Sequence, residues 1–168
     1  MTGRFAIAAL VVLLAAVVSV ASAVAGGATK TPVETTAMID LGAQPPCERS
    51  WTSDGVDHAR GCPTYGSFTA GDFAGGTLSA LSNFNFNLKT LKGTGWGTVT
   101  YVTPLGTFEG SYVEKSSFDI STFVLTLEGK LVGRSEDGRK LKLKWIGAGF
   151  VFGVITYEVE GTILDPPS

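Results

Sequence analysis

The sequence predicts an all-β fold: a single small antiparallel β-barrel of six to eight strands, with a β-sandwich as the alternative. Three observations support this. Apolar and polar residues alternate with a period of two along most of the chain, turn-forming residues separate the alternating runs, and the 168 residues include 22 glycines. Alternation is typical of strands with one buried and one wet face. Glycines inside strands mark bulges and bends, where a sheet can curl and close into a barrel.

The alternation is clearest in residues 83–89 (NFNFNLK) and 140–145 (KLKLKW). Lys140, Lys142 and Lys144 share one face of the second run, and we expect them to keep an edge strand from pairing with another molecule. Further runs rich in β-branched and aromatic residues predict strands. These runs cover residues 97–103, 107–113, 121–132 and 151–164. A short helix within residues 76–81 is an alternative for that stretch.

Turn chemistry predicts the hairpins. Residues 103–106 (TPLG) and 135–138 (SEDG) each end in glycine. A type I turn followed by a glycine bulge fits both and joins antiparallel neighbours. We expect further connections at the polar residues 113–118 and at the glycine-rich residues 147–149.

The N-terminus predicts export. Residues 5–20 are apolar except for Ser19, Arg4 precedes them, and small-x-small patterns follow at 21–23 and 23–25. This is the pattern of a signal peptide, here residues 1–23, and it predicts a secreted or extracytoplasmic protein without a membrane span after cleavage. The alternative is an uncleaved segment that anchors the protein in a membrane.

The mature chain is predicted to divide into two parts. Residues 24–46 are expected to form a flexible N-terminal segment, ordered only near 37–41 as a first short strand. Residues 47–168 are expected to form the barrel domain. Cys47 and Cys62 meet oxidising surroundings after export, so we predict a disulfide that closes the loop 47–62. Closing a loop of this size stabilises a fold by about 3 kcal/mol in the chain-entropy model.

The loop 47–62 carries the candidate binding residues Trp51, Asp54, Asp57 and His58, and His58 is the only histidine. Asp57 beside His58 suggests an oriented imidazole, and Asp54, Asp57 and His58 together suggest three metal ligands from one turn. Trp51 suggests a stacking surface. The simpler interpretation is a solvated loop with a turn at Asp54 and Gly55. We predict neither a catalytic residue nor a metal site.

Aromatic and acidic residues of the strands raise a second possibility, a site inside the barrel. Nine aromatic side chains either line a cavity or pack as an ordinary core, and packing is the simpler expectation. They are Phe84, Phe86, Tyr101, Phe108, Tyr112, Phe123, Trp145, Phe150 and Tyr157. Glu109, Glu128 and Glu160 each precede a glycine. An inward-facing glutamate would be a catalytic candidate through a raised pKa, but we expect all three to face solvent.

Composition and motifs limit the function classes. With 13 basic and 15 acidic residues, the net charge of −2 does not support a nucleic-acid partner. The sequence has no glycine-rich phosphate loop, HExxH, GxSxG, EF-hand or CxxC pattern, so no cofactor is predicted. In size, export signal and strand density the chain resembles calycin-like and allene-oxide-cyclase-like barrels. It holds no motif of either family, so the resemblance implies architecture alone.

Two functional hypotheses follow. The preferred one is a non-catalytic exported barrel that binds a small apolar or amphipathic ligand, or a surface partner. The alternative is a small enzyme of the isomerase or hydrolase type at the barrel mouth beside the loop 47–62. In that enzyme Asp57 and His58 would form the acid–base pair and Trp51 the substrate platform.

Overall fold

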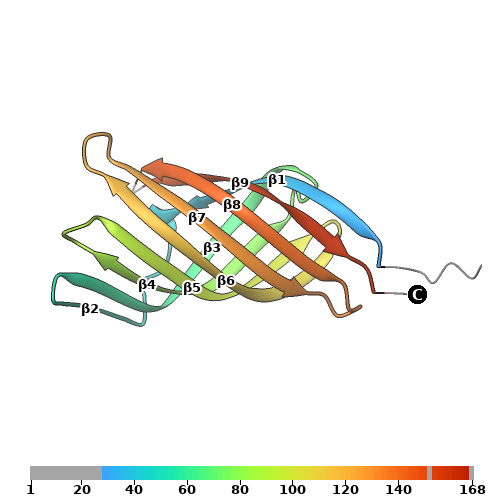
Figure 1. Ribbon diagram of the computed structural model, residues 1–168, viewed down its shortest axis with the longest axis horizontal. Helices are drawn as coiled ribbons and strands as arrows, with labels where there is room; N and C mark the ends of the chain where they lie inside the picture. The colour runs from blue at the N-terminus through green and yellow to red at the C-terminus, as the bar shows by residue number, and fades with distance from the viewer. Residues whose placement is uncertain (1–27, 151–152, 167–168) are drawn as a thin grey trace, which may run out of the picture.

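The computed structural model describes residues 28–150 and 153–166 and shows a nearly all-β chain. Eight antiparallel strands close into a barrel, and an additional strand, β2, pairs with one part of β3 (Figure 1). The predicted fold class is therefore confirmed. The elements are β1 (Lys30–Asp40), the 3₁₀-helix η1 (Leu41–Ala43), β2 (Arg49–Ser53), β3 (Val56–Gly71), β4 (Thr77–Asn87), β5 (Lys92–Thr103), β6 (Gly106–Asp119), β7 (Val124–Arg134), β8 (Lys140–Phe150) and β9 (Val154–Leu164).

The barrel is a chain of hairpins closed by its first strand. Strands β3 to β8 each pair with the next strand in sequence, and β1 pairs with both β9 and β3. Lys140, Lys142 and Lys144 alternate with the buried Leu141, Leu143 and Trp145, as predicted. The prediction that these lysines protect an edge strand is wrong, because β8 pairs with β7 and β9 along its length. These lysines instead lie on the outer, solvent-exposed face of the barrel wall.

The predicted domain boundary at residue 47 is also wrong. The flexible segment was expected to span 24–46, but β1 begins at Lys30 and is a full strand of the barrel. Its inward positions include Val33, Thr35, Ala37 and Ile39. Thr35 and Ala37 are only weakly hydrophobic or polar, so the alternation of apolar and polar residues along β1 is hard to recognise from hydropathy. The predicted signal peptide, residues 1–23, lies outside the described residues.

Three smaller predictions fail for related reasons. Residues 76–81 lie largely in β4 rather than in a helix, residues 113–118 continue β6, and residues 147–149 continue β8. In β6 the inward positions after Tyr112 are Glu114 and Ser116, so a polar inward face looked like a connection. In β8 the inward Gly147 lies beneath the ring of Tyr157.

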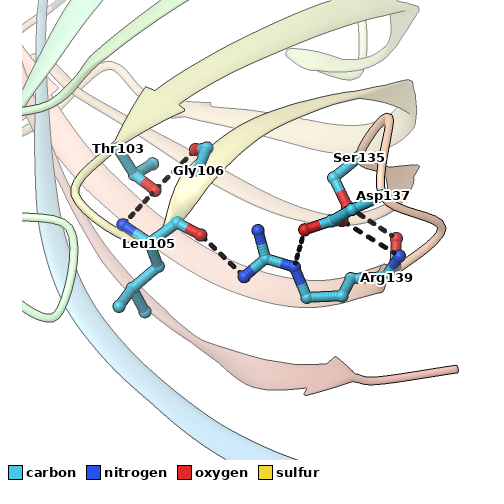
Figure 2. Close-up of polar contacts among 6 residues, drawn as sticks. All are labelled: Thr103, Leu105, Gly106, Ser135, Asp137 and Arg139. Atoms are coloured by element: carbon cyan, nitrogen blue, oxygen red, sulfur yellow. Dashed lines mark hydrogen bonds and ion pairs between the residues drawn. The ribbon is translucent and has the colours of Figure 1, made fainter. Parts of the chain in front are cut away.

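Glycine turns and aromatic side chains close one end of the barrel, which we call the closed end. Gly106 and Gly138 end the two predicted turns with φ of +124° and +86°. Arg139 joins these turns (Figure 2): its Nε donates to Asp137 Oδ2 and its Nη1 to the Leu105 carbonyl, each at 2.8 Å. Its guanidinium lies 5.4 Å from the centre of the Phe108 ring. Arg139 therefore covers the barrel end and ties two hairpins together.

The interior of the closed end is filled by aromatic rings in edge contact. Phe73, in the turn between β3 and β4, meets Phe68 edge to face at 5.2 Å, and Phe68 meets Tyr101 in the same way at 5.2 Å. Phe73 is fully buried. The series leads from the closed end toward the middle of the barrel. Within the residues described, no helix has the length and apolar character needed to cross a membrane.

Candidate functional site

The middle of the barrel contains a cavity of about 460 Å³. It extends from Tyr101 to the opposite end of the barrel, where Pro45, Pro46, Phe86 and Leu125 line it. Most of its wall is apolar. The cavity arises because alanine and serine at inward positions leave space that larger side chains fill elsewhere in the barrel; these positions are Ala37, Ala80, Ser82 and Ser116.

Glu114 brings a carboxyl group into this cavity from β6. It follows the buried Tyr112 by two residues, so both side chains face inward. Its cross-strand partners are Gly95 and Gly129. A Cβ atom at position 95 would lie 2.7 Å from Glu114 Oε1, so the carboxyl occupies space that this glycine leaves.

The environment of Glu114 favours its neutral form at acid pH. Burial raises the pKa of the carboxyl from its ordinary value of 4.5 to about 7, and the indole N–H of Trp145 opposes part of this rise. The contact falls short of a hydrogen bond, so the Trp145 Nε1 atom is buried without a partner among the described residues. A donor without an acceptor and a carboxyl without a cation thus face the same space.

Three tyrosines surround these groups. Burial raises the pKa of Tyr101, Tyr112 and Tyr157, and the charge of Glu114 raises the pKa of all three further. Tyr112 donates its hydroxyl hydrogen to Ser82 Oγ at 2.6 Å, and its ring lies 6.0 Å from that of Trp145. We call this group the polar centre. Its members are Ser82, Tyr101, Tyr112, Glu114, Trp145 and Tyr157.

Inward glycines make room for the rings of the polar centre. Gly129 pairs with Trp145, and a Cβ atom at position 129 would lie 2.3 Å from Cζ2 of that indole. The side chain of Trp145 therefore lies flat over the neighbouring strand. Without this glycine the ring would have to move into the cavity.

We expect Gly129→Ala to lower the free energy of unfolding by about 1–3 kcal/mol, the usual cost of overpacking a core. Urea denaturation measures this, and a shifted tryptophan emission would report the displaced ring. Gly133→Ala, in the same strand, is the control, since its nearest contact would be 3.0 Å and the next 3.4 Å. Equal losses in the two variants would contradict the special role of Gly129.

The predicted loop 47–62 includes the β2–β3 hairpin, and Trp51 and His58 lie together on its outer face. Their rings stack at 4.8 Å, and the Arg60 guanidinium lies between Trp51 and Trp96, at 5.2 and 4.8 Å from their centres. His58 Nδ1 donates to Asn85 Oδ1 at 2.8 Å. The Ser53 hydroxyl lies 3.1 Å from the other ring nitrogen. Both imidazole nitrogens are therefore occupied.

The structure does not bring Asp57 to His58. Successive residues of a strand face opposite sides, and the Asp57 carboxylate accepts a hydrogen bond from Thr52 Oγ1 at 2.6 Å. Asp54 and Gly55 form the predicted turn, with φ of +52° and +76°. No cluster of three histidine, cysteine, aspartate or glutamate side chains suited to a metal occurs in the part of the chain described.

The predicted disulfide is present between Cys47 and Cys62. Both cysteines line the cavity, so the bond holds the segment after η1 against the barrel wall. Gln44 adds two hydrogen bonds across the same gap, donating to the Tyr65 carbonyl at 3.1 Å and accepting from the Tyr65 N–H at 2.6 Å. This segment forms one side of the cavity mouth.

Sequence analysis missed Glu114 and judged the other three glutamates correctly. Glu109, Glu128 and Glu160 are exposed, as expected. Among the nine aromatic candidates, Tyr101, Phe108, Tyr112, Trp145 and Tyr157 are buried, whereas Phe123 and Phe150 face outward. Counting by two from Phe108 and Tyr112 places Glu114 on the inward face, and that signal was available in the sequence.

Comparison with known proteins adds no family. The chain matches no protein-family model, no curated protein and no solved structure.

Proposed function

We propose that this protein binds a small amphipathic molecule inside its barrel, with the apolar part against the cavity wall and the polar part at the polar centre. The observation that carries the proposal is the cavity itself. Its volume of about 460 Å³ falls in the range of small-molecule sites, roughly 300–1,000 Å³. Such sites are mostly apolar and contain a few polar groups that orient the ligand.

The unpaired polar groups support binding rather than simple packing. A buried donor without an acceptor costs about 1–3 kcal/mol, so ordinary cores avoid it. Trp145 is only 7% exposed and its N–H has no partner among the described residues. The ionised Glu114 carboxylate can accept a hydrogen bond from this N–H, so a ligand that stabilises the ionised carboxylate would remove this cost. Binding would thus recover energy that the empty barrel gives up.

The outer face of the β2–β3 hairpin supports a structural role instead. His58 is held by Asn85 and Ser53, and Asp57 lies on the opposite face. An acid–base pair needs its members within hydrogen-bond reach of each other or of one substrate atom. The stack of Trp51, His58 and Arg60 instead stiffens the wall that extends beyond the cavity mouth.

Export is part of the proposal. The Cys47–Cys62 disulfide supports it, because such bonds form and persist in oxidising compartments such as the extracellular space or the periplasm.

A matched pair of substitutions tests where ligands bind. Ala80 lines the cavity, whereas the next residue of β4, Leu81, faces outward and is 48% exposed. We expect Ala80→Phe to weaken binding of an environment-sensitive apolar fluorophore at least about tenfold, about 1.4 kcal/mol, by filling the cavity. Leu81→Phe should leave binding unchanged. Titration by fluorescence measures both, and circular dichroism checks that both variants keep the β fold.

The proposal fails if folded Ala80→Phe binds the fluorophore as the wild type does, or if the wild type shows no saturable one-to-one binding. Native mass spectrometry of protein purified from its own host gives an independent test. We expect a mass increment from a bound small molecule that Ala80→Phe reduces.

A further inference from the structure

The geometry points to an organic cation as the ligand: an amine or quaternary ammonium on an apolar body, held by the Glu114 carboxylate among the rings of the polar centre. This inference rests on the proposed function and names the chemical class that the cavity would select.

The charge of the cavity lining favours a cationic ligand. Glu114 is the only charged side chain among the described residues that line the cavity, and no lysine, arginine or histidine lines it. A buried carboxylate without a cation is strongly unfavourable, and proteins normally supply a lysine or arginine beside it. Here none of the described residues of the cavity lining supplies one. A cationic ligand would provide the missing partner.

The aromatic side chains of the cavity wall also favour a cationic ligand. Tyr101, Tyr112, Trp145 and Tyr157 come from β5, β6, β8 and β9 and line the same cavity as the carboxyl. The faces of tyrosine and tryptophan rings attract cations, most strongly when the contact is desolvated. Tyr112 and Trp145 are tilted by 56° at 6.0 Å, so two of these rings form a corner rather than a flat stack. Aromatic corners of this kind suit ammonium groups.

The same lining disfavours an anionic ligand. An anionic ligand at the polar centre would meet the Glu114 carboxylate, with no cationic side chain in the described lining to compensate. A neutral ligand would pair best with the protonated carboxyl. The three ligand classes therefore differ in how pH changes their affinity.

Only one group at the polar centre changes charge between pH 5 and pH 8. The titratable groups that face Glu114 are Tyr101, Tyr112 and Tyr157, and burial raises the pKa of each above its ordinary value of 10. They stay neutral in this range. The Trp145 N–H does not titrate and favours the ionised carboxylate. The pH dependence of binding thus reports on Glu114 for a ligand whose own charge does not change in this range, such as a quaternary ammonium or an alcohol.

The experiment compares three ligands with the same ten-carbon chain: decyltrimethylammonium, 1-decanol and decanoate. The two ionic ligands are kept below their micelle concentrations and 1-decanol below its solubility limit. Isothermal titration calorimetry at pH 5 and pH 8 measures their affinities. At pH 8 we expect the cation to bind more tightly than the other two ligands. With the pKa of Glu114 at about 7, its ionised fraction rises about 100-fold between these values, and the affinity for the cation rises with it.

Two glutamates of β6 provide the variant and its control. Glu114→Gln should weaken binding of the cation at pH 8 by about 100-fold, to the level at pH 5, and should abolish the pH dependence of cation binding. Glu109→Gln removes the same charge from the exposed face of the same strand, and it should change nothing.

The outcomes separate this inference from the proposed function. If 1-decanol or decanoate binds as tightly as the cation, or if cation binding is independent of pH, the ligand is not a cation and only this inference falls. If none of the three binds while the fluorophore still enters the cavity, again only this inference falls. If neither the ten-carbon ligands nor the fluorophore binds, the proposed function falls as well.

Discussion

Phe73→Ala is expected to lower the free energy of unfolding by about 3–5 kcal/mol, the usual cost of removing a buried phenylalanine. Phe73 lies in a turn, yet it is fully buried and its ring meets Phe68, which meets Tyr101. Two backbone hydrogen bonds hold the turn that carries Phe73 against Phe68. The Phe68 N–H donates to the Gly76 carbonyl and the Gly75 N–H donates to the Phe68 carbonyl, each at 2.9 Å. The surrounding turn therefore cannot easily collapse into the space left by the ring.

Urea denaturation of the variant and the wild type measures this effect. Phe123→Ala is the matched control, because Phe123 is also a turn phenylalanine but is 65% exposed. It should change the free energy of unfolding by no more than about 0.5 kcal/mol. A small loss in Phe73→Ala, comparable to that of the control, would show that the ring does not fill the closed end.

A second large effect concerns pH and Glu114. In the ligand-free protein the pKa of this carboxyl is about 7, against an ordinary value of 4.5. Between these values the folded state holds a proton that the unfolded state has lost, so stability falls as pH rises from about 4.5 to about 7 and stays low above it. The shift corresponds to a loss of up to about 3 kcal/mol.

Glu114→Gln should remove this loss, since the amide stays neutral at every pH. The free energy of unfolding, measured in urea at pH 5 and pH 8, should then fall between these values in the wild type but not in the variant. Taking the difference between the two proteins cancels the titration of all other groups. Glu109→Gln should retain the wild-type slope. The measured quantity is the difference in free energy of unfolding between the wild type and Glu114→Gln. If this difference is the same at pH 8 as at pH 5, the carboxyl is not buried as described.

Most of the fold follows from local patterns. Strands such as β8 alternate strictly, and the turns at Gly106 and Gly138 carry the expected glycines. The errors fall where inward residues are small or polar, as at Thr35 in β1 and at Glu114 and Ser116 in β6. Hydropathy cannot distinguish a polar residue facing a cavity from one facing solvent. The polar inward residues that form the candidate site also interrupt the apolar alternation by which β6 would be recognised.

The candidate site was harder to predict than the fold. The sequence favours the loop 47–62 as a site because His58, Trp51 and two aspartates are close together along the chain. The polar centre, in contrast, gathers Tyr101, Glu114, Trp145 and Tyr157 from four strands. These residues are brought together by barrel closure, and no spacing within a single segment reveals that they lie close to one another.

By itself, the sequence determined that the chain would form antiparallel strands with one buried face, where two hairpins would turn, and which cysteines would join. These properties depend on neighbours along the chain: side chains alternate between faces, and glycine permits positive φ. Only the tertiary structure decided that the sheet closes around a cavity and that Glu114 and Trp145 face each other inside it. Those facts depend on the register and curvature of eight strands together. An inward-facing side chain meets its neighbours only when the barrel has closed and the opposite wall is in place.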